Sequence, residues 1–318
     1  MTSILLAYDG SPSAAAAIRA AGSLFPGAET VALTVRRDPS TSPSGGVAEI
    51  ALPGAAIAGA MQALERAAGE EAATLAAEGA GAATAVGLAA TAQVVSGIAN
   101  PWREIQGAAA TVGAELIACG SRGLGAPARF VLGSTSTGLL YHADRPLLIV
   151  PRFDEATGGP LVIGYDGSAP SREAIVVAGH LLAGRDAVVV CVWESLIRHS
   201  VSGRALASLP LEEVRGLTRD LDAYYGDVAA DVAEEGAALA RESGLSATAA
   251  QVEAAGSAWH GLLAYARGSA ATAVVVGARG RGGFSSELLG SVSSGLAHHA
   301  DLPVLVLGGA GFPQPMRG

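Results

Sequence analysis

The feature that most constrains this chain is an internal repeat. A shift of 157 positions lays Ala7–Ser11 (AYDGS) on Gly164–Ser168 (GYDGS) and Leu132–Val150 on Leu289–Leu307. Matching alanines are expected by chance in such an alanine-rich chain. Matching tyrosine, aspartate, arginine, histidine and proline at one constant offset are not. The sequence therefore predicts a duplication, with two copies of one fold.

The length fits this interpretation. With 318 residues, the chain is long for one small domain and sufficient for two of about 150 residues, each with its own core. We expect a first domain over residues 1–151, a linker over 152–159, a second domain over 160–308 and a tail over 309–318.

Composition excludes several classes of function. The net charge of −9 and pI near 5.2 offer no basic surface for nucleic acid or for an anionic membrane. All 20 basic residues are arginine, which excludes a P-loop lysine, a Schiff base and a lysine general base. We find no HExxH, CxxC or Gly-x-Ser-x-Gly motif, so the sequence predicts no catalytic residues and no metal ligands.

Cysteine usage and the chain start suggest a compartment. Cys119 and Cys191 lie in apolar runs and are expected to be buried free thiols in a reducing compartment. MTSILLAYDG has no basic region before its apolar run, so we expect a first strand and a cytoplasmic protein. The uncharged stretch Gly79–Ala99 lacks the large apolar residues of a membrane span, and we expect a helix end, a turn and a strand.

Each copy repeats the same pattern of elements. A short apolar run ends in Asp-Gly, a helix opened by serine and proline follows, and further apolar runs alternate with helical segments. The longest helical segments are expected at Ala55–Glu78 and Leu206–Ser243. Strands that are uniformly apolar and alternate with helices predict a parallel sheet covered on both faces. The fold class is therefore α/β, with two tandem doubly wound domains.

In doubly wound domains, ligands bind beyond the carboxyl ends of the strands, where the winding reverses. The glycine loop after the fourth apolar run has one spacing in both copies: glycine, two residues, glycine, nine residues, then Gly-Ser. The helix that follows would present unpaired N–H groups to a phosphate, with hydroxyls such as those of Ser291 and Ser293 beside them. We expect residues 281–289, between the glycines, to form a lid.

A structural interpretation competes with the ligand-binding one. The glycines can simply turn the chain, and Ser291 can simply cap its helix. Asp9 and Asp166 can accept from a ribose hydroxyl or an adenine amine, or can merely form the Asp-Gly turn. Arg122 and Arg279 lie inside the glycine loops, where they can either attract phosphate or remain solvated. His142 and His299 are expected to cap a helix or pack rather than act as bases.

These residues resemble the universal stress protein family in a tandem form, with the skeleton G-2x-G-9x-G-[ST] in both halves below a strand-terminal Asp-Gly-Ser. In the ATP-binding branch, the resemblance implies that the glycine loop and hydroxyls hold phosphates and ribose, the aspartate contacts adenosine and a second-strand residue contacts the base. The implied nucleotide-binding residues are Asp9, Val35, Gly120, Gly123, Gly133, Ser134, Thr135, Ser136, Asp166, Val192, Gly277, Gly280, Gly290, Ser291, Val292 and Ser293.

The resemblance also implies a five-stranded parallel sheet of order 3-2-1-4-5 in each domain, which would place the aspartate beside the glycine loop. The family pairs through its last strand, so the halves are expected to form an intramolecular pseudo-dimer, with a homodimer as a further step. The first copy departs from the pattern at Thr135, Pro127 and Arg129, so we expect it to be the weaker site.

The implied function is a cytoplasmic stress-response protein that binds ATP, ADP or AMP in one or both domains and signals to an unidentified protein partner. Mg²⁺ would arrive with the nucleotide, and little or no turnover is expected. The first alternative is a slow ATP hydrolase, a phosphotransferase or an adenylating enzyme, although the Ser-Gly-Gly-x-Asp-Ser loop of adenylating relatives is replaced here by Ala7–Ser11. The second is a nucleotide-free dimerising scaffold.

Overall fold

The computed structural model describes residues 2–37, 54–97, 100–123, 132–151, 158–195, 211–254, 256–280 and 289–308. By its internal contacts the chain divides into two compact units, Met1–Asp154 and Glu155–Gly318, each carrying one copy of the repeat. The predicted tail, most of the predicted linker, nearly all of the predicted lid, and Pro127 and Arg129 lie outside the described residues.

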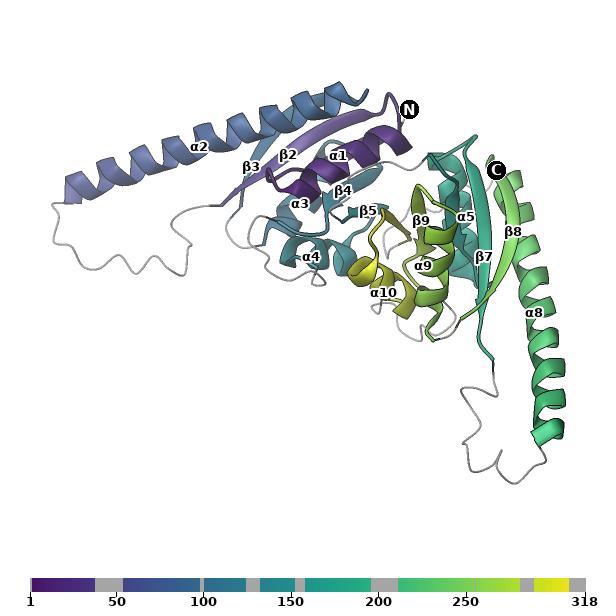
Figure 1. Ribbon diagram of the computed structural model, residues 1–318. Coiled ribbons are helices and arrows are strands. Elements are labelled where there is room, and N and C mark those ends of the chain that lie inside the picture. Colours follow the sequence, from purple (N-terminus) through teal and green to yellow (C-terminus); the bar gives the residue numbers. More distant parts are fainter. Residues whose placement is uncertain are drawn as a thin grey trace. The chain divides into compact units, whose positions relative to one another are not determined.

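The first unit is a doubly wound α/β domain (Figure 1). Its elements are β1 (Ser3–Ala7), α1 (Pro12–Leu24), β2 (Glu29–Arg37), α2 (Gly54–Ala85), β3 (Ala89–Gly97), α3 (Pro101–Thr111), β4 (Leu116–Gly120), α4 (Ser134–His142) and β5 (Leu147–Val150). The strands are all parallel and lie in the order β3-β2-β1-β4-β5, which confirms the predicted 3-2-1-4-5 order.

The second unit repeats this arrangement. Its elements are β6 (Leu161–Gly164), α5 (Ala169–Leu181), β7 (Asp186–Trp193), α8 (Leu211–Glu242), β8 (Ser246–Glu253), α9 (Ala258–Gly268), β9 (Ala273–Gly277), α10 (Ser291–His299) and β10 (Val304–Leu307). The parallel strands lie in the order β8-β7-β6-β9-β10. The predicted fold class is therefore confirmed in both copies.

The central strands are apolar along their whole length because both faces of the sheet are covered. Strands β5 and β10 are buried at every position, and β4 and β9 at every position but the last. Helix α1 packs against α2, and α3 against α4. Right-handed crossovers that run outward from β1 to β3 and then back to β4 and β5 place these pairs on opposite faces.

The turn from the first strand into the first helix has the same chemistry in both units. Gly10 and Gly167 adopt φ of 75° and 77°, a left-handed conformation that glycine reaches without strain. The side chain of Ser11 then caps α1 by accepting from the N–H of Ala14 at 3.2 Å. In the second unit, Ser168 caps α5 in the same way.

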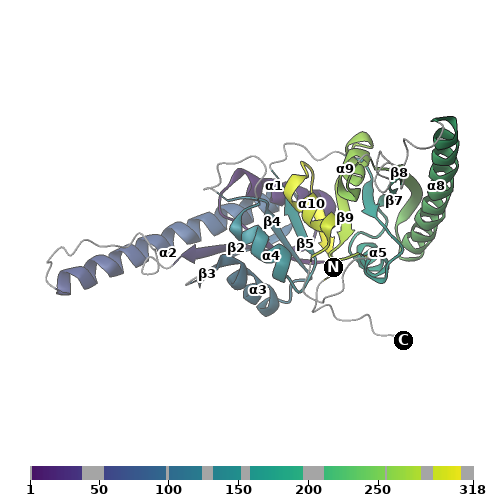
Figure 2. The ribbon, with the colours of Figure 1, turned by 90° about the horizontal axis from the view of Figure 1, so that it is seen from below.

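Each long helix, α2 and α8, continues beyond the ends of the strands that it packs against (Figures 1 and 2). Helix α2 runs to Ala85, a short turn follows, and β3 begins at Ala89, as expected for the uncharged stretch. In the second unit the helix is described from Leu211 rather than Leu206, because residues 196–210 lie outside the described part.

Candidate functional site

Strand order brings two loops of each unit together. Because β1 pairs directly with β4, the turn after Ala7 and the loop after Gly120 leave the sheet side by side. A Cβ atom added to Gly123 would lie 2.6 Å from Oδ2 of Asp9. In the second unit, a Cβ atom on Gly280 would lie 3.0 Å from Oδ2 of Asp166. The aspartate and the glycine loop therefore meet in both units.

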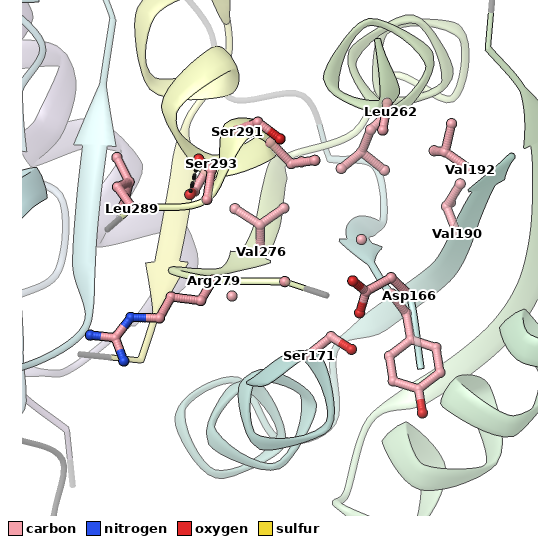
Figure 3. A pocket seen from close by; sticks show the side chains of 17 residues that line it. Asp166, Ser171, Val190, Val192, Leu262, Val276, Arg279, Leu289, Ser291 and Ser293 are labelled. Carbon is pink, nitrogen blue, oxygen red and sulfur yellow. Dashed lines mark hydrogen bonds between the residues drawn. The ribbon is translucent and has the colours of Figure 1, made fainter. Parts of the chain in front are cut away.

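A pocket opens at this meeting point in the first unit, with a volume of about 820 Å³. All the predicted residues of the first copy line it: Asp9, Val35, Gly120, Gly123, Gly133, Ser134, Thr135 and Ser136. The second unit has an equivalent pocket of about 530 Å³ (Figure 3). Its lining includes Asp166, Val192, Gly277, Gly280, Gly290, Ser291, Val292 and Ser293. Both volumes lie in the range usual for small-molecule sites.

The two carboxylate oxygens of each aspartate lie in different surroundings. Oδ1 of Asp9 accepts from the N–H of Ser11 at 3.0 Å, and Oδ1 of Asp166 accepts from the N–H of Ser168 at 3.0 Å. This is the turn-forming role that competed with ligand binding in the sequence. The second carboxylate oxygen is the one that approaches the glycine loop, so turn formation and a contact with a ligand do not exclude each other.

The first glycine of each loop lies close to the backbone of the first helix. A Cβ atom on Gly120 would lie 2.6 Å from the carbonyl carbon of Ser13, at the start of α1. A Cβ atom on Gly277 would lie 3.2 Å from the carbonyl oxygen of Pro170, at the start of α5. The expected turn off the strand is therefore also a packing contact with the first helix.

The helices α4 and α10 point their N-termini at the pockets. Gly133 and Gly290 are the N-caps, and neither provides a side chain that could accept from the first-turn N–H groups. These N–H groups have no acceptor inside the helix and carry the positive end of its dipole. The loop is fixed beneath them, because the N–H of Gly290 donates to the carbonyl of Ala278 at 2.8 Å.

One serine in each copy differs from the sequence expectation. The Ser293 side chain is almost fully buried, and its hydroxyl lies 3.0 Å from the carbonyls of both Ala278 and Gly290. Ser136 makes the equivalent bonds to Ser121 and Gly133. A hydroxyl carries one proton, so these serines hold the loop against the helix and do not add a donor to the pocket.

The loop arginines lie at the pockets, and a contact of either with phosphate stays a prediction. Arg122 and Arg279 line their pockets, but in Figure 3 the Arg279 guanidinium points away from Asp166. In the first unit, the carbonyl of Arg122 accepts from Ser11 and from Ser13, which ties the glycine loop to the start of α1.

The histidines pack, as expected. His142 ends α4 and stacks on Trp102 with ring centroids 4.6 Å apart. His299 ends α10 and stacks on Trp259 at 4.7 Å. These duplicated pairs fasten α4 to α3 and α10 to α9. No motif in the sequence marks the two tryptophans as the partners of these histidines.

Several lining residues were missed from the sequence. The apolar wall includes Ile105 of α3 in the first pocket and Leu262 of α9 in the second, and these two residues are one repeat apart. Their spacing of one repeat is the feature of the sequence that could have singled them out. An apolar position in a helix does not by itself distinguish a pocket wall from the core. Glu71 and Leu75 of α2 also line the first pocket, and no local motif marks them.

The buried ionisable groups near the pockets are poor bases and nucleophiles. Burial, together with the negative charge of Asp9, raises the pKa of Cys119 to about 12. Burial and the hydrogen bond to Glu235 raise the pKa of Tyr165 to about 12. Both groups stay protonated near neutral pH.

Comparison with known proteins agrees with this architecture. The model of the universal stress protein family matches residues 1–151 and 159–308. The chain belongs to the universal stress protein family. The predicted family, in its tandem form, is thereby confirmed.

Curated universal stress proteins of mycobacteria are among the relatives of this chain. One from Mycolicibacterium smegmatis is 33% identical over 213 residues, covering 62% of this chain and 63% of the relative. One from Mycobacterium tuberculosis H37Rv is 32% identical over 202 residues, covering 61% of each. The matched part thus spans about three fifths of these relatives.

A solved universal stress protein from Archaeoglobus fulgidus has the same fold. It aligns with a TM-score of 0.59 at 19% identity, covering 96% of this chain and 97% of the other. Within the described residues, no helix has the length and apolarity needed to cross a membrane. The same part of the chain holds no group of three or more His, Cys, Asp or Glu side chains arranged for a metal ion.

Proposed function

We propose that both pockets of this universal stress protein bind an adenine nucleotide, ATP or ADP, as a regulatory ligand with little or no turnover. The observation that carries the proposal is the convergence, in two copies, of a helix N-terminus, a glycine loop and a strand-terminal aspartate on one cavity. Mg²⁺ would accompany the nucleotide, and AMP is the smaller ligand of the same class.

The phosphates belong at the helix N-terminus. The backbone N–H groups at the start of α10 and the hydroxyl of Ser291 are donors, and the helix dipole favours an anion. Four or five such donors at about 1.5–3 kcal/mol each, reduced by ordering and desolvation, are compatible with a binding free energy of about −8 kcal/mol, a micromolar Kd. No lysine is needed.

The nucleoside fits the remaining surface. Oδ2 of Asp166 is an acceptor for a ribose hydroxyl or an adenine amine. Val190, Val192 and Leu262 form an apolar wall that would pack against the base (Figure 3). In the first pocket Leu33, Val35 and Ile105 occupy the equivalent positions.

The expectation of little turnover rests on the titratable groups of the pocket wall. In the second pocket, Oδ1 of Asp166 accepts from the N–H of Ser168, and the proposal assigns Oδ2 to the nucleoside. Tyr165 has a pKa of about 12 and a hydroxyl that donates to Glu235, so it is not suited to remove a proton from an attacking water at neutral pH. The same proposal includes a cytoplasmic location, the pairing of the two halves as a pseudo-dimer, and a protein partner that senses whether nucleotide is bound.

Calorimetry on the purified chain tests the proposal. ATP should give saturable heat, and Asp166→Ala should weaken binding in the second pocket about tenfold, because the loss of a hydrogen bond to a charged group costs about 1.5–3 kcal/mol. Asp227→Ala is the control, because it removes an aspartate from α8 that does not line the pocket.

Mass spectrometry of the denatured protein should reveal co-purified adenine nucleotide. If ATP gives no binding heat and no nucleotide co-purifies, the nucleotide-free dimerising scaffold is favoured instead. Steady release of phosphate or pyrophosphate at more than a trace rate would favour an enzyme.

A further inference from the structure

The long helices of the two halves can be compared residue by residue. Tyr8 lies over Gly79 of α2, where an added Cβ atom would be 2.8 Å from its Cδ1 atom. Tyr165 lies over Gly236 of α8, where the same distance is 2.6 Å. The second pair lies one repeat, 157 positions, after the first. The two helices therefore pack against their sheets in the same register. Glu71 of α2 therefore corresponds to Val228 of α8.

These corresponding residues differ in their relation to the pockets. Glu71 lines the first pocket together with Leu75, one turn further along α2. A Cβ atom on Gly10, next to Asp9, would lie 3.0 Å from Cδ1 of Leu75, which places this part of α2 over the aspartate turn. Val228 is 41% exposed and does not line the second pocket.

Because Glu71 lines the first pocket and Val228 does not line the second, the charged residues that line the two pockets differ. Among the described lining residues, the first pocket has the carboxylates of Asp9 and Glu71 and one guanidinium, that of Arg122. The second has one carboxylate, that of Asp166, and one guanidinium, that of Arg279. Among the described residues, the lining of the first pocket therefore carries one more negative charge than that of the second.

We propose that Glu71 makes the first pocket favour adenine ligands with few phosphate charges, whereas the second pocket, with Val228 at the equivalent position, accepts the triphosphate. This inference rests on the proposed function and deepens it by assigning different ligands to the two halves. The repulsion between a carboxylate and a polyphosphate grows with the number of phosphate charges and is absent for a neutral nucleoside.

The effect is electrostatic, which gives it a distinct signature. Glu71 is exposed, so salt screens its charge and the effect is moderate: about three- to tenfold in the Kd for ATP at low ionic strength. It should be strongest for Mg²⁺-free ATP and should largely disappear at about 0.5 M salt.

Each pocket can be measured alone in the full chain. Gly280→Val would place methyl groups beside Asp166, between the aspartate and the glycine loop, and should block nucleotide binding in the second pocket; Gly123→Val would do the same beside Asp9 in the first. The test compares the Kd of ATP with that of adenosine by calorimetry, without Mg²⁺ and at low ionic strength. Thermal unfolding of every variant establishes that it is folded.

In the Gly280→Val background, Glu71→Gln should tighten ATP binding about three- to tenfold and leave adenosine unchanged. Glu70→Gln is the matched control, because it removes the same charge from the neighbouring residue of α2, which does not line the pocket.

Three results would overturn the inference: an unchanged ratio of ATP to adenosine affinity in Glu71→Gln, an equal change in Glu70→Gln, or an effect that persists at high salt. Each of these leaves the proposed function intact if the unaltered chain still binds nucleotide. If neither pocket of the unaltered chain binds adenosine, AMP, ADP or ATP, the proposed function itself fails and the inference falls with it.

Discussion

Gly123 and Gly280 set how closely the glycine loop approaches the first-strand aspartate. The space that a Cβ atom would take is already limited by the carboxylate, at 2.6 Å in the first unit and 3.0 Å in the second. Larger side chains at these positions would occupy the pocket itself. A side chain at Gly123 or Gly280 would press on the carboxylate of the aspartate, whereas one at Gly120 would overlap the backbone of the first helix and one at Gly277 would crowd it.

Cys119 leads to a prediction about pH. Burial raises the pKa of its thiol from an ordinary value of 9.0 to about 12 in the folded protein. The folded state therefore holds this proton more tightly than the unfolded state, so the contribution to the free energy of unfolding is full below pH 9 and is lost as the pH rises toward 12. Tyr165, whose pKa rises from 10.0 to about 12, acts in the same direction.

Urea unfolding at a series of pH values should show this loss. Cys119→Val, which installs the residue that Val276 provides in the second copy, should have a shallower decline above pH 9 than the unaltered chain. The thiol of the folded protein should also resist alkylation until denaturant is added. An identical pH profile in both proteins, or rapid labelling of the folded protein, would contradict the prediction.

At the scale of elements, a tryptophan, a glycine and a histidine hold α4 to α3. Trp102 stacks on His142, and a Cβ atom added to Gly138 would overlap its ring. The same arrangement joins α10 to α9 through Trp259, Gly295 and His299. Because α4 and α10 carry the helix N-termini of the pockets, these contacts orient the proposed phosphate donors.

Gly138→Ala should therefore destabilise the protein by about 1–3 kcal/mol, the usual cost of overpacking a filled site. Gly107→Ala in α3 is the matched control, because nothing lies within 4 Å of its added Cβ atom. That change should stabilise the helix by about 0.5–1 kcal/mol. Thermal unfolding of the two variants should shift in opposite directions, and equal shifts would contradict the assigned contact.

Element types followed from sequence patterns that recur within each copy, whereas the strand order was implied by the family resemblance. Uniformly apolar runs between helical segments predict buried parallel strands, and the Ser-Pro start of α1 and α5 is a local capping signal. The position of the long α2 over the first pocket was not predictable. It depends on a packing contact between Tyr8 and Gly79, which are distant in sequence and carry no motif.

For the whole molecule, two pockets in one chain predict two bound nucleotides. Saturating nucleotide at about 100 times its Kd should raise the free energy of unfolding of an occupied unit by about 2.7 kcal/mol. In Gly280→Val, the second unit should lose this stabilisation and the binding stoichiometry should fall from two to one. Differential scanning calorimetry with and without ADP measures the stabilisation of the units, and isothermal titration with ADP measures the stoichiometry. A stoichiometry that stays at two in this variant would contradict the assignment of the second pocket.

The family resemblance implied the place where the aspartate and the glycine loop meet, and the sequence by itself determined the duplication and the doubly wound fold of each copy. It could do so because turns, caps and strand tips are specified by neighbouring residues, and the repeat displays each of them twice. Only the tertiary structure decided which atoms face the cavity. It turns the hydroxyls of Ser136 and Ser293 inward to the loop carbonyls, and it brings Glu71 over the first pocket while its counterpart Val228 stays outside the second. These outcomes depend on how helices pack across a sheet, and no local pattern encodes that packing.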